Sequence, residues 1–484
     1  MTRTQTRDEQ RHGGLDRFFQ ISARGSTVGR EVRGGLVTFV TMAYIVVLNP
    51  IILGGPDSGG TLLGQGRIAA ATALVAGVMS ILMGVIGRFP LAIAAGLGLN
   101  GYIAGLVGAK LVTWPEAMGL VVIEGLVITL LVLTGFRTAV FNAIPLPLKT
   151  AISVGIGMFI AFIGLVDGGF VRKQSNTFST VPVELGVGGT LQGWPIVVFV
   201  IGVLLTAVLL AKRVRGAILI SIIVCTVLAA VLEAIFHIGV VGPKNPAGWG
   251  NSVPTLPSHL FTPPDLSLIG KFSVGGAFVH AGVLASVVIV FSLILSDFFD
   301  MMGTIVGVNA QAGLVDERGR LPGIGRALFV DALAAVAGGG ASVSSNTAYV
   351  ESASGVGEGA RTGLASVVTG VLLLLAMFFA PLVAVVPSQA ASPALVVVGF
   401  LMMTRITSID WKDYGAAIPS FLTIALMPFT YSITNGIGAG FISYVVIKIA
   451  QRRAREIHPL LWVVAACFVV YFAIHPIERL LGVS

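Results

Sequence analysis

The sequence predicts an all-α polytopic membrane protein with about fourteen transmembrane segments, arranged as two inverted repeats of seven. Of its 484 residues, 55% are hydrophobic and only 11% are charged, whereas soluble domains carry about 25% charged residues. Apolar segments follow one another along nearly the whole chain, and many are long enough to cross a bilayer as helices. A polar, proline-rich stretch near residues 240–276 divides them into two groups of equal number.

We expect seven segments on each side of this stretch. The predicted ranges are 34–54, 67–87, 91–108, 117–135, 148–166, 195–211 and 217–239, then 277–308, 323–340, 345–358, 362–386, 391–404, 416–430 and 433–450. Because seven crossings reverse the direction of the chain, the second group would have inverted topology. A last apolar run covers 460–474, and the sequence leaves open whether it spans the membrane.

This interpretation divides the chain into five parts. They are a cytoplasmic tail (1–33), a first repeat (34–239), an extracellular or periplasmic connection (240–276), a second repeat (277–450), and a basic loop with a C-terminal hydrophobic helix (451–484). The basic tracts lie on the cytoplasmic side if the N-terminus is inside. We therefore expect a multi-pass protein of the cell (plasma) membrane with a cytoplasmic N-terminus.

Charge and motif content argue against several other classes of protein. The formal net charge is +8, but the basic residues occur in short tracts between apolar segments, so nucleic acid is not an expected partner. The six histidines are scattered without metal-ligand spacing. We expect no metal, no cofactor and no enzymatic activity. The sequence has no catalytic combination of nucleophile and base, and it has no soluble domain that could hold such a site.

Two segments at matching positions of the two halves are unsuited to plain spanning helices. Residues 88–102 are rich in glycine, and residues 341–352 are rich in polar side chains. Non-helical backbone at membrane depth is tolerated only where it is buried in protein or lines a cavity. Paired interruptions of this kind indicate the substrate site of a transporter. We expect each segment to begin as a short strand and to continue as a half-helix.

Two carboxylates, Asp297 and Asp300, follow the long apolar run that begins the second half. Residues three apart lie on one face of a helix, so the two side chains would point the same way. An acidic side chain at membrane depth costs about 2.5–3.5 kcal/mol on insertion, so it normally faces a partner or a watery cavity. The pair therefore predicts a functional site within the membrane.

Several linked motifs resemble those of one known family. They are Thr41-Met-Ala-Tyr44, Gly98-Leu-Asn100, Ser296-Asp297-Phe298-Phe-Asp300 with Gly303-Thr304, Tyr349-Val-Glu351-Ser352, and Met427-Pro-Phe-Thr430. From about residue 18 to 448 the chain resembles the AzgA-like adenine/guanine/hypoxanthine permeases, a branch of the nucleobase/cation symporters related to uracil and xanthine permeases. The resemblance implies a core domain of segments 1–4 and 8–11 and a gate domain of segments 5–7 and 12–14.

The resemblance also implies a function and a set of residues. The expected function is proton-coupled uptake of purine bases, with the core shifting against the gate. In that family, the positions matching Asn100, Asp297, Asp300 and Glu351 are associated with substrate binding and proton coupling. Asn346 departs from the usual Thr/Ser-rich pattern and adds an amide beside the expected pocket.

Purine recognition needs in-plane donors and acceptors between apolar walls. Glu351 and Asp297 can accept base N–H groups, and the interrupted segment can supply backbone and side-chain groups. The predicted substrate-binding residues are Glu351, Asp297, Asn100, Asn346, Ser345, Thr347 and Phe298, and the predicted proton-coupling residues are Asp297, Asp300 and Glu351. A further carboxylate within an apolar run, Glu124, is interpreted as structural.

Alternatives remain at this stage. The same architecture could carry another nucleobase, such as uracil or xanthine, or a small anion, and a channel or a membrane enzyme is a more distant alternative. The preferred purine, the carboxylate that carries the proton, and proton rather than sodium coupling are not determined by the sequence. A homodimer also stays open.

Overall fold

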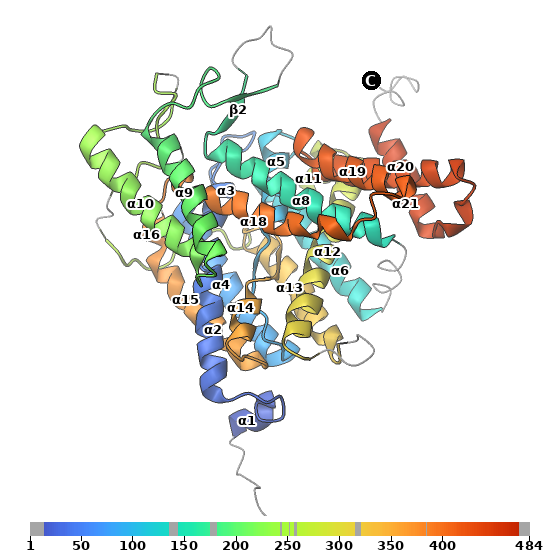
Figure 1. Cartoon of the computed structure of the whole chain (residues 1–484), viewed down its shortest axis with the longest axis horizontal. Coiled ribbons are helices and arrows are strands. Elements are labelled where there is room, and N and C mark those ends of the chain that lie inside the picture. The colour runs from blue at the N-terminus through green and yellow to red at the C-terminus, as the bar shows by residue number, and fades with distance from the viewer. Residues whose placement is uncertain are drawn as a thin grey trace, which may run out of the picture.

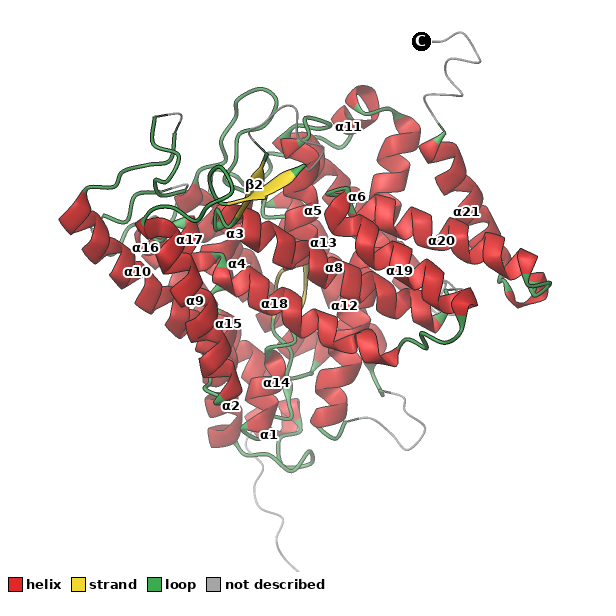
Figure 2. Cartoon of the chain, turned by 45° about the horizontal axis from the view of Figure 1, so that its top comes forward, coloured by secondary structure: helices red, strands yellow, loops and turns green. Residues whose placement is uncertain are grey.

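The computed structural model describes residues 14–134, 144–174, 182–242, 244–250, 252–255, 259–314, 321–383 and 385–473, except the side chains of residues 299, 300, 302, 303, 306, 307 and 310. The regular secondary structure of the described residues is almost entirely helical, as predicted (Figures 1 and 2). Two short antiparallel strand pairs, β1 with β4 and β2 with β3, are the exceptions among these residues.

The first half of the chain alternates long helices with short connections. Its elements are α1 (Gly14–Phe19), α2 (Val28–Met42), α3 (Ile45–Ile52), α4 (Gln65–Leu82), β1 (Ile93–Ala95), α5 (Leu97–Gly108), α6 (Trp114–Leu133), α8 (Leu146–Asp167), β2 (Val171–Lys173), β3 (Val183–Leu185), α9 (Trp194–Ala211) and α10 (Ala217–Phe236). Side chains at several helix starts satisfy free backbone groups. Thr27 accepts from the Arg30 N–H at α2, and Glu116 accepts from the Thr113 N–H at α6 at 2.8 Å.

The second half repeats this pattern of strand and helix. Its elements are α11 (Gly276–His280), α12 (Val283–Gln311), α13 (Ile324–Gly340), β4 (Asn346–Ala348), α14 (Ser352–Gly357), α15 (Gly363–Ala376), α16 (Ala380–Val383), α17 (Ser388–Ala391), α18 (Pro393–Met403), α19 (Tyr414–Phe429), α20 (Ile433–Ala450) and α21 (Pro459–Phe472). The N-terminal α1 and the β2–β3 hairpin lie at opposite ends of the molecule (Figure 1).

Nine helical stretches in the described ranges are long and apolar enough to cross a membrane. They are Val28–Ile52, Gln65–Gly87, Trp114–Leu133, Leu146–Asp167, Trp194–Ala211, Ala217–Phe236, Gly363–Val383, Ser388–Ser408 and Ile433–Ala450. Shorter apolar helices cover Leu97–Gly108, Val283–Phe298, Tyr414–Phe429 and Pro459–Phe472. The chain is a multi-pass membrane protein, as predicted, with fewer long spans than the fourteen expected segments. Two of those segments begin as strands, and α13 is 17 residues long.

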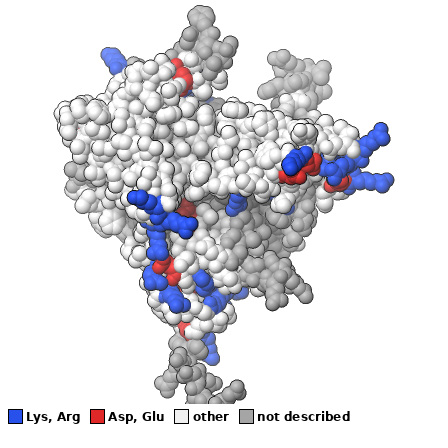
Figure 3. All heavy atoms as spheres, viewed as in Figure 1, with Lys and Arg blue, Asp and Glu red and all other residues white. Residues whose placement is uncertain are grey.

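Charged side chains are concentrated at a few places on the surface. Most of the Lys and Arg side chains visible in Figure 3 lie in the lower part of the view, beside α2, and at the right, beyond the end of α20, while the upper part of this face is largely uncharged. Beyond α20, the Glu456 carboxylate lies 3.0 Å from Lys448 Nζ and 2.6 Å from Arg453 Nε. Hydrogen bonds from these two bases lower the pKa of Glu456.

The interrupted segments of the two halves meet in the middle of the protein. Strands β1 and β4 pair antiparallel, with Ile93 opposite Ala348 and Ala95 opposite Asn346. Each strand leads into a helix, β1 into α5 and β4 into α14, so the prediction of a strand followed by a half-helix is confirmed. The pairing satisfies backbone N–H and C=O groups that a bilayer could not.

Helices of the two halves also pack in matching pairs. Helix α4 packs on α15, and α6 packs on α13, so the second segment of each half contacts the fourth segment of the other. Glycines permit this close approach. A Cβ on Gly363 would lie 2.0 Å from the carbonyl oxygen of Gly84, in the π-helical turn Met83–Gly87 that continues α4. A Cβ on Gly125 would lie 2.5 Å from the Val336 nitrogen. Outside these pairs, α8 packs against α18 and α19.

Candidate functional site

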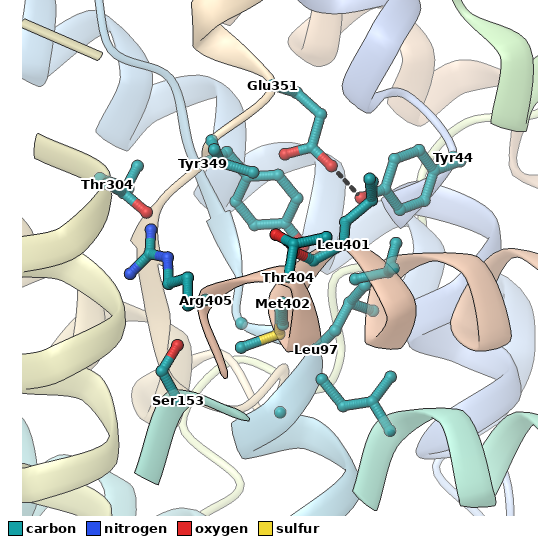
Figure 4. A pocket seen from close by; sticks show the side chains of 16 residues that line it. Tyr44, Leu97, Ser153, Thr304, Tyr349, Glu351, Leu401, Met402, Thr404 and Arg405 are labelled. Atoms are coloured by element: carbon teal, nitrogen blue, oxygen red, sulfur yellow. Dashed lines mark hydrogen bonds between the residues drawn. The ribbon is translucent and has the colours of Figure 1, made fainter. Parts of the chain in front are cut away.

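A cavity of about 360 Å³ lies beside the β1–β4 pair. One wall comes from α3, the two strand–helix units and α12, and the other comes from α8, α18 and the turn after α18 (Figure 4). Its lining residues are Tyr44, Gly96, Leu97, Gly98, Ser153, Ile160, Thr304, Ala348, Tyr349, Val350, Glu351, Val398, Leu401, Met402, Thr404 and Arg405. The cavity therefore combines an apolar lining with a few polar groups, as small-molecule sites do.

Glu351 projects a carboxylate into this cavity from the residue just before α14. Its Oε1 accepts a hydrogen bond from the Tyr44 hydroxyl, drawn as the dashed line in Figure 4. The neighbouring Tyr349 is held in place because its hydroxyl donates to the Ala95 carbonyl oxygen at 2.6 Å. The interrupted segment that contains β4 thus brings an acid and an aromatic ring to the same cavity.

Arg405 supplies a positive charge at the opposite wall. It lies in the short helical turn Thr404–Ser408 after α18, and its side chain is exposed. In Figure 4 its guanidinium lies between Thr304 of α12 and Ser153 of α8. Neither Arg405 nor Tyr44 was among the residues predicted for the site. Nothing in the sequence spacing relates either residue to Glu351.

The α12 residues of the predicted site are buried beside the cavity. Asp297 is completely buried and Phe298 is 5% exposed, and neither lines the cavity. Thr304 lines it, and it lies seven residues beyond Asp297, which is two turns or about 10 Å along the same helix face. The Asp300 side chain is outside the described residues. The cavity therefore reaches α12 two turns away from the acidic residue that was expected to contact substrate.

The other predicted residues bond to helices behind the strands or to backbone of their own segment. The Asn100 amide donates to Asn49 Oδ1 at 2.7 Å, and the Asn346 amide donates to the Ser344 carbonyl oxygen at 3.1 Å. Ser345 and Thr347 donate their hydroxyls to carboxylates, at 3.3 and 3.2 Å respectively. All four predicted residues are buried, and none lines the cavity. Of the seven predicted substrate-binding residues, Glu351 is the one that does.

The described residues contain no group of three or more His, Cys, Asp or Glu side chains that could hold a metal ion. The polar side-chain groups that line the cavity are one carboxylate, several hydroxyls and one guanidinium. Such a set can bind a planar molecule that carries both hydrogen-bond donors and acceptors.

Comparison with known proteins identifies the family. Residues 29–478 match the Xan_ur_permease model, described as the Permease family. The protein belongs to this family. It is 39% identical to the guanine/hypoxanthine permease PbuG of Bacillus subtilis (strain 168), over 94% of this chain and 98% of that protein. It is 37% identical to the adenine permease AdeQ of Escherichia coli (strain K12), over 94% of this chain and 95% of that protein. The resemblance to adenine/guanine/hypoxanthine permeases is confirmed.

Solved structures of other transporters share the fold of this Permease family member. The transmembrane domain of the cyanobacterial bicarbonate transporter BicA superposes with a TM-score of 0.54 at 16% identity, over 85% of this chain and 96% of that one. The murine anion transporter Slc26a9 in the inward-facing state superposes with a TM-score of 0.60 at 11% identity, over 93% of this chain and 74% of that one. At these identities the likeness concerns the fold alone. Family membership makes the protein a transporter and not an enzyme, as predicted.

Proposed function

We propose that the protein is a secondary active transporter that takes up purine bases (adenine, guanine and hypoxanthine) together with protons. Relatives similar over almost their whole length are named guanine/hypoxanthine and adenine permeases, which favours purines over uracil or xanthine. A membrane potential contributes about 2.3 kcal/mol per charge per 100 mV, enough to concentrate a neutral base that moves with a proton.

The observation that carries this proposal is the Glu351 carboxylate in the cavity, held by Tyr44. A carboxylate accepts two hydrogen bonds in one plane, which suits the ring N–H and exocyclic amino groups of a purine. Tyr349 and the apolar residues Leu97 and Met402 offer surfaces for the ring faces. The cavity volume of about 360 Å³ lies within the range of about 300–1,000 Å³ typical of small-molecule sites.

Transport would occur by movement of a core domain (segments 1–4 and 8–11) against a gate domain (segments 5–7 and 12–14). The cavity supports this division, because its walls come from α3, α12 and the strand–helix units on one side and from α8 and α18 on the other. The matching packing of α4 on α15 and α6 on α13 supports two inverted seven-segment repeats. The basic tracts support a cytoplasmic N-terminus.

The other predicted residues have proposed roles around this centre. Asp297, Asp300 and Glu351 are the proposed proton-coupling carboxylates. The complete burial of Asp297 supports such a role for this residue, because burial disfavours the charged form of an acid. Asn100 would brace the first interrupted segment through Asn49. The remaining residues would shape the wall of the site from β4 and α12; they are Ser345, Asn346, Thr347 and Phe298.

Uptake of labelled adenine, guanine and hypoxanthine tests the proposal. Cells that express the protein should accumulate at least one of these bases above the outside concentration, and an uncoupler should abolish the accumulation because it removes the proton gradient. Accumulation that an uncoupler does not affect would contradict proton coupling.

A small anion is the second candidate, and Arg405 in the cavity wall is the observation that favours it. The two candidates predict opposite effects of Arg405→Gln. A neutral base does not need a cation, so base uptake should change by less than about tenfold, the equivalent of 1.4 kcal/mol. Anion transport should be lost, because a buried anion needs its counter-charge. Initial uptake rates of guanine and bicarbonate, normalised to the amount of protein in the membrane, measure both effects.

A further inference from the structure

A second polar centre lies behind β4 and outside the cavity. Glu124 of α6 and Asp331 of α13 are both completely buried, and neither lines the cavity. The two helices pack closely because Gly125 and Gly339 lie in their interface: a Cβ on Gly339 would be 2.8 Å from the Val122 nitrogen. The halves of the chain thus bring two carboxylates together from positions far apart in sequence.

Both carboxylates are bonded to the interrupted strand. The Ser345 hydroxyl donates to Glu124 Oε1 at 3.3 Å. Asp331 Oδ1 accepts from the Thr347 hydroxyl at 3.2 Å and from the Ala348 backbone N–H at 3.0 Å. Ala348 itself lines the cavity, three residues before Glu351. Asp331 is therefore one hydrogen bond away from the wall of the proposed substrate site.

The surroundings of Glu124 favour a bound proton. Its second oxygen, Oε2, is buried without a hydrogen-bond partner among the described residues. The Asp331 carboxylate lies nearby, because Ser345, which bonds to Glu124, and Thr347, which bonds to Asp331, are two residues apart on one face of the segment. Two carboxylates that are close together inside a membrane protein repel each other when both are charged, so the doubly charged state is unfavourable. A proton on one of them removes the repulsion and supplies an O–H donor.

The side-chain amide of Asn346, next to Ser345 and Thr347, is an independent indication that a hydrogen-bond donor binds in this region. Asn346 is completely buried, and its Oδ1 has no hydrogen-bond partner among the described residues. Its Nδ2 would lie 2.3 Å from a Cβ on Gly338, and Gly338 is two turns from Asp331 on the same face of α13. An unpaired buried acceptor costs about 1–3 kcal/mol, so this region favours a bound donor such as an acid proton.

The titratable groups on the elements around the pair are few. On α6, Glu116 lies two turns away and contacts His280 at 2.6 Å. Helix α12 contributes Asp297, and α5 contributes Tyr102, whose hydroxyl is hydrogen-bonded to Thr434. Strand β4 contributes the amide and hydroxyls already described. Helix α13 also carries Arg326, one turn and a half before Asp331.

We propose that Glu124 and Asp331 together bind one proton, and that this site is required for coupling proton movement to transport. The inference rests on the proposed function and adds a coupling site that is separate from the substrate cavity. A proton from the outer water converts one carboxylate of the pair to a carboxylic acid. Its release to the inner side restores the charge, strengthens the hydrogen bonds from Thr347 and Ala348, and so changes the position of β4 beside Glu351.

The test uses purified protein in proteoliposomes and the variant Glu124→Gln, which is permanently neutral and of the same shape. Exchange of labelled base at equal pH should persist. In the wild type, an inward gradient of one pH unit should drive about tenfold accumulation of base if one proton is coupled. In Glu124→Gln this accumulation should be lost. Glu116→Gln, a carboxylate on the same helix, is the matched control and should accumulate base like the wild type.

The outcomes separate the two proposals. Normal gradient-driven accumulation in Glu124→Gln would overturn the pair while leaving purine transport intact. A wild-type protein that neither exchanges nor accumulates any base would overturn the proposed function itself. If Glu124→Gln does not yield folded protein, Ser345→Ala keeps both carboxylates and removes the hydrogen bond to Glu124. Its accumulation should then show a shifted pH midpoint, and an unchanged midpoint would overturn the pair.

Discussion

Replacing Glu351 with glutamine is expected to weaken purine-base binding by about 10- to 100-fold, because a hydrogen bond to a charged group contributes about 1.5–3 kcal/mol. The Glu351 carboxylate lines the cavity and accepts from Tyr44. Glutamine keeps the shape of the side chain but places an N–H₂ donor where the base also donates. Equilibrium binding of labelled adenine, guanine and hypoxanthine to purified protein measures the loss.

The control for this variant is a carboxylate elsewhere in the protein. Glu184 lies in the β2–β3 hairpin and does not line the cavity, so Glu184→Gln should bind base like the wild type. Folded Glu351→Gln protein with wild-type affinity for every base would contradict the assignment of the site.

Replacing Gly363 with leucine is expected to destabilise the folded protein by about 3 kcal/mol or more, which is the upper range of overpacking effects. A Cβ at this position would lie 2.0 Å from the Gly84 carbonyl oxygen, and backbone cannot yield as a flexible side chain does. Helix α15 would have to move away from α4, which packs on β1. Thermal unfolding in detergent, followed by size-exclusion chromatography, should show little or no folded protein at room temperature.

Gly29→Leu provides a matched control. Gly29 also lies in the first turn of a helix, α2, and a Cβ there would have no heavy atom within 4 Å. This variant should keep wild-type stability. Equal stability of Gly363→Leu and Gly29→Leu would show that the close approach of α4 and α15 is not required.

Much of the fold could be predicted because hydropathy and backbone chemistry act locally. Apolar runs long enough to span a bilayer predict helices whatever their neighbours are. The interrupted segments could be recognised from their glycine and polar content, and β1 with α5 and β4 with α14 have the expected strand–helix form. The lengths of the apolar helices were harder to predict, because α5 and α14 each begin only after a strand.

The site was harder to predict because its contacts join distant parts of the chain. Tyr44 and Glu351 are 307 residues apart in sequence, and no spacing rule connects them. Ser345 and Thr347 have the polar character of binding residues, but their hydroxyls face Glu124 and Asp331, which the sequence did not relate to each other. Sequence patterns therefore found the polar segment, while tertiary packing decides which of its side chains face the cavity.

A competition binding assay on purified protein tests the central claim most directly. Labelled guanine should bind at a single site and be displaced by hypoxanthine or adenine, but not by bicarbonate or sulfate at the same concentrations, because Glu351 is an acceptor for base N–H groups. Saturable binding of either anion, with no binding of any purine base, would contradict the account.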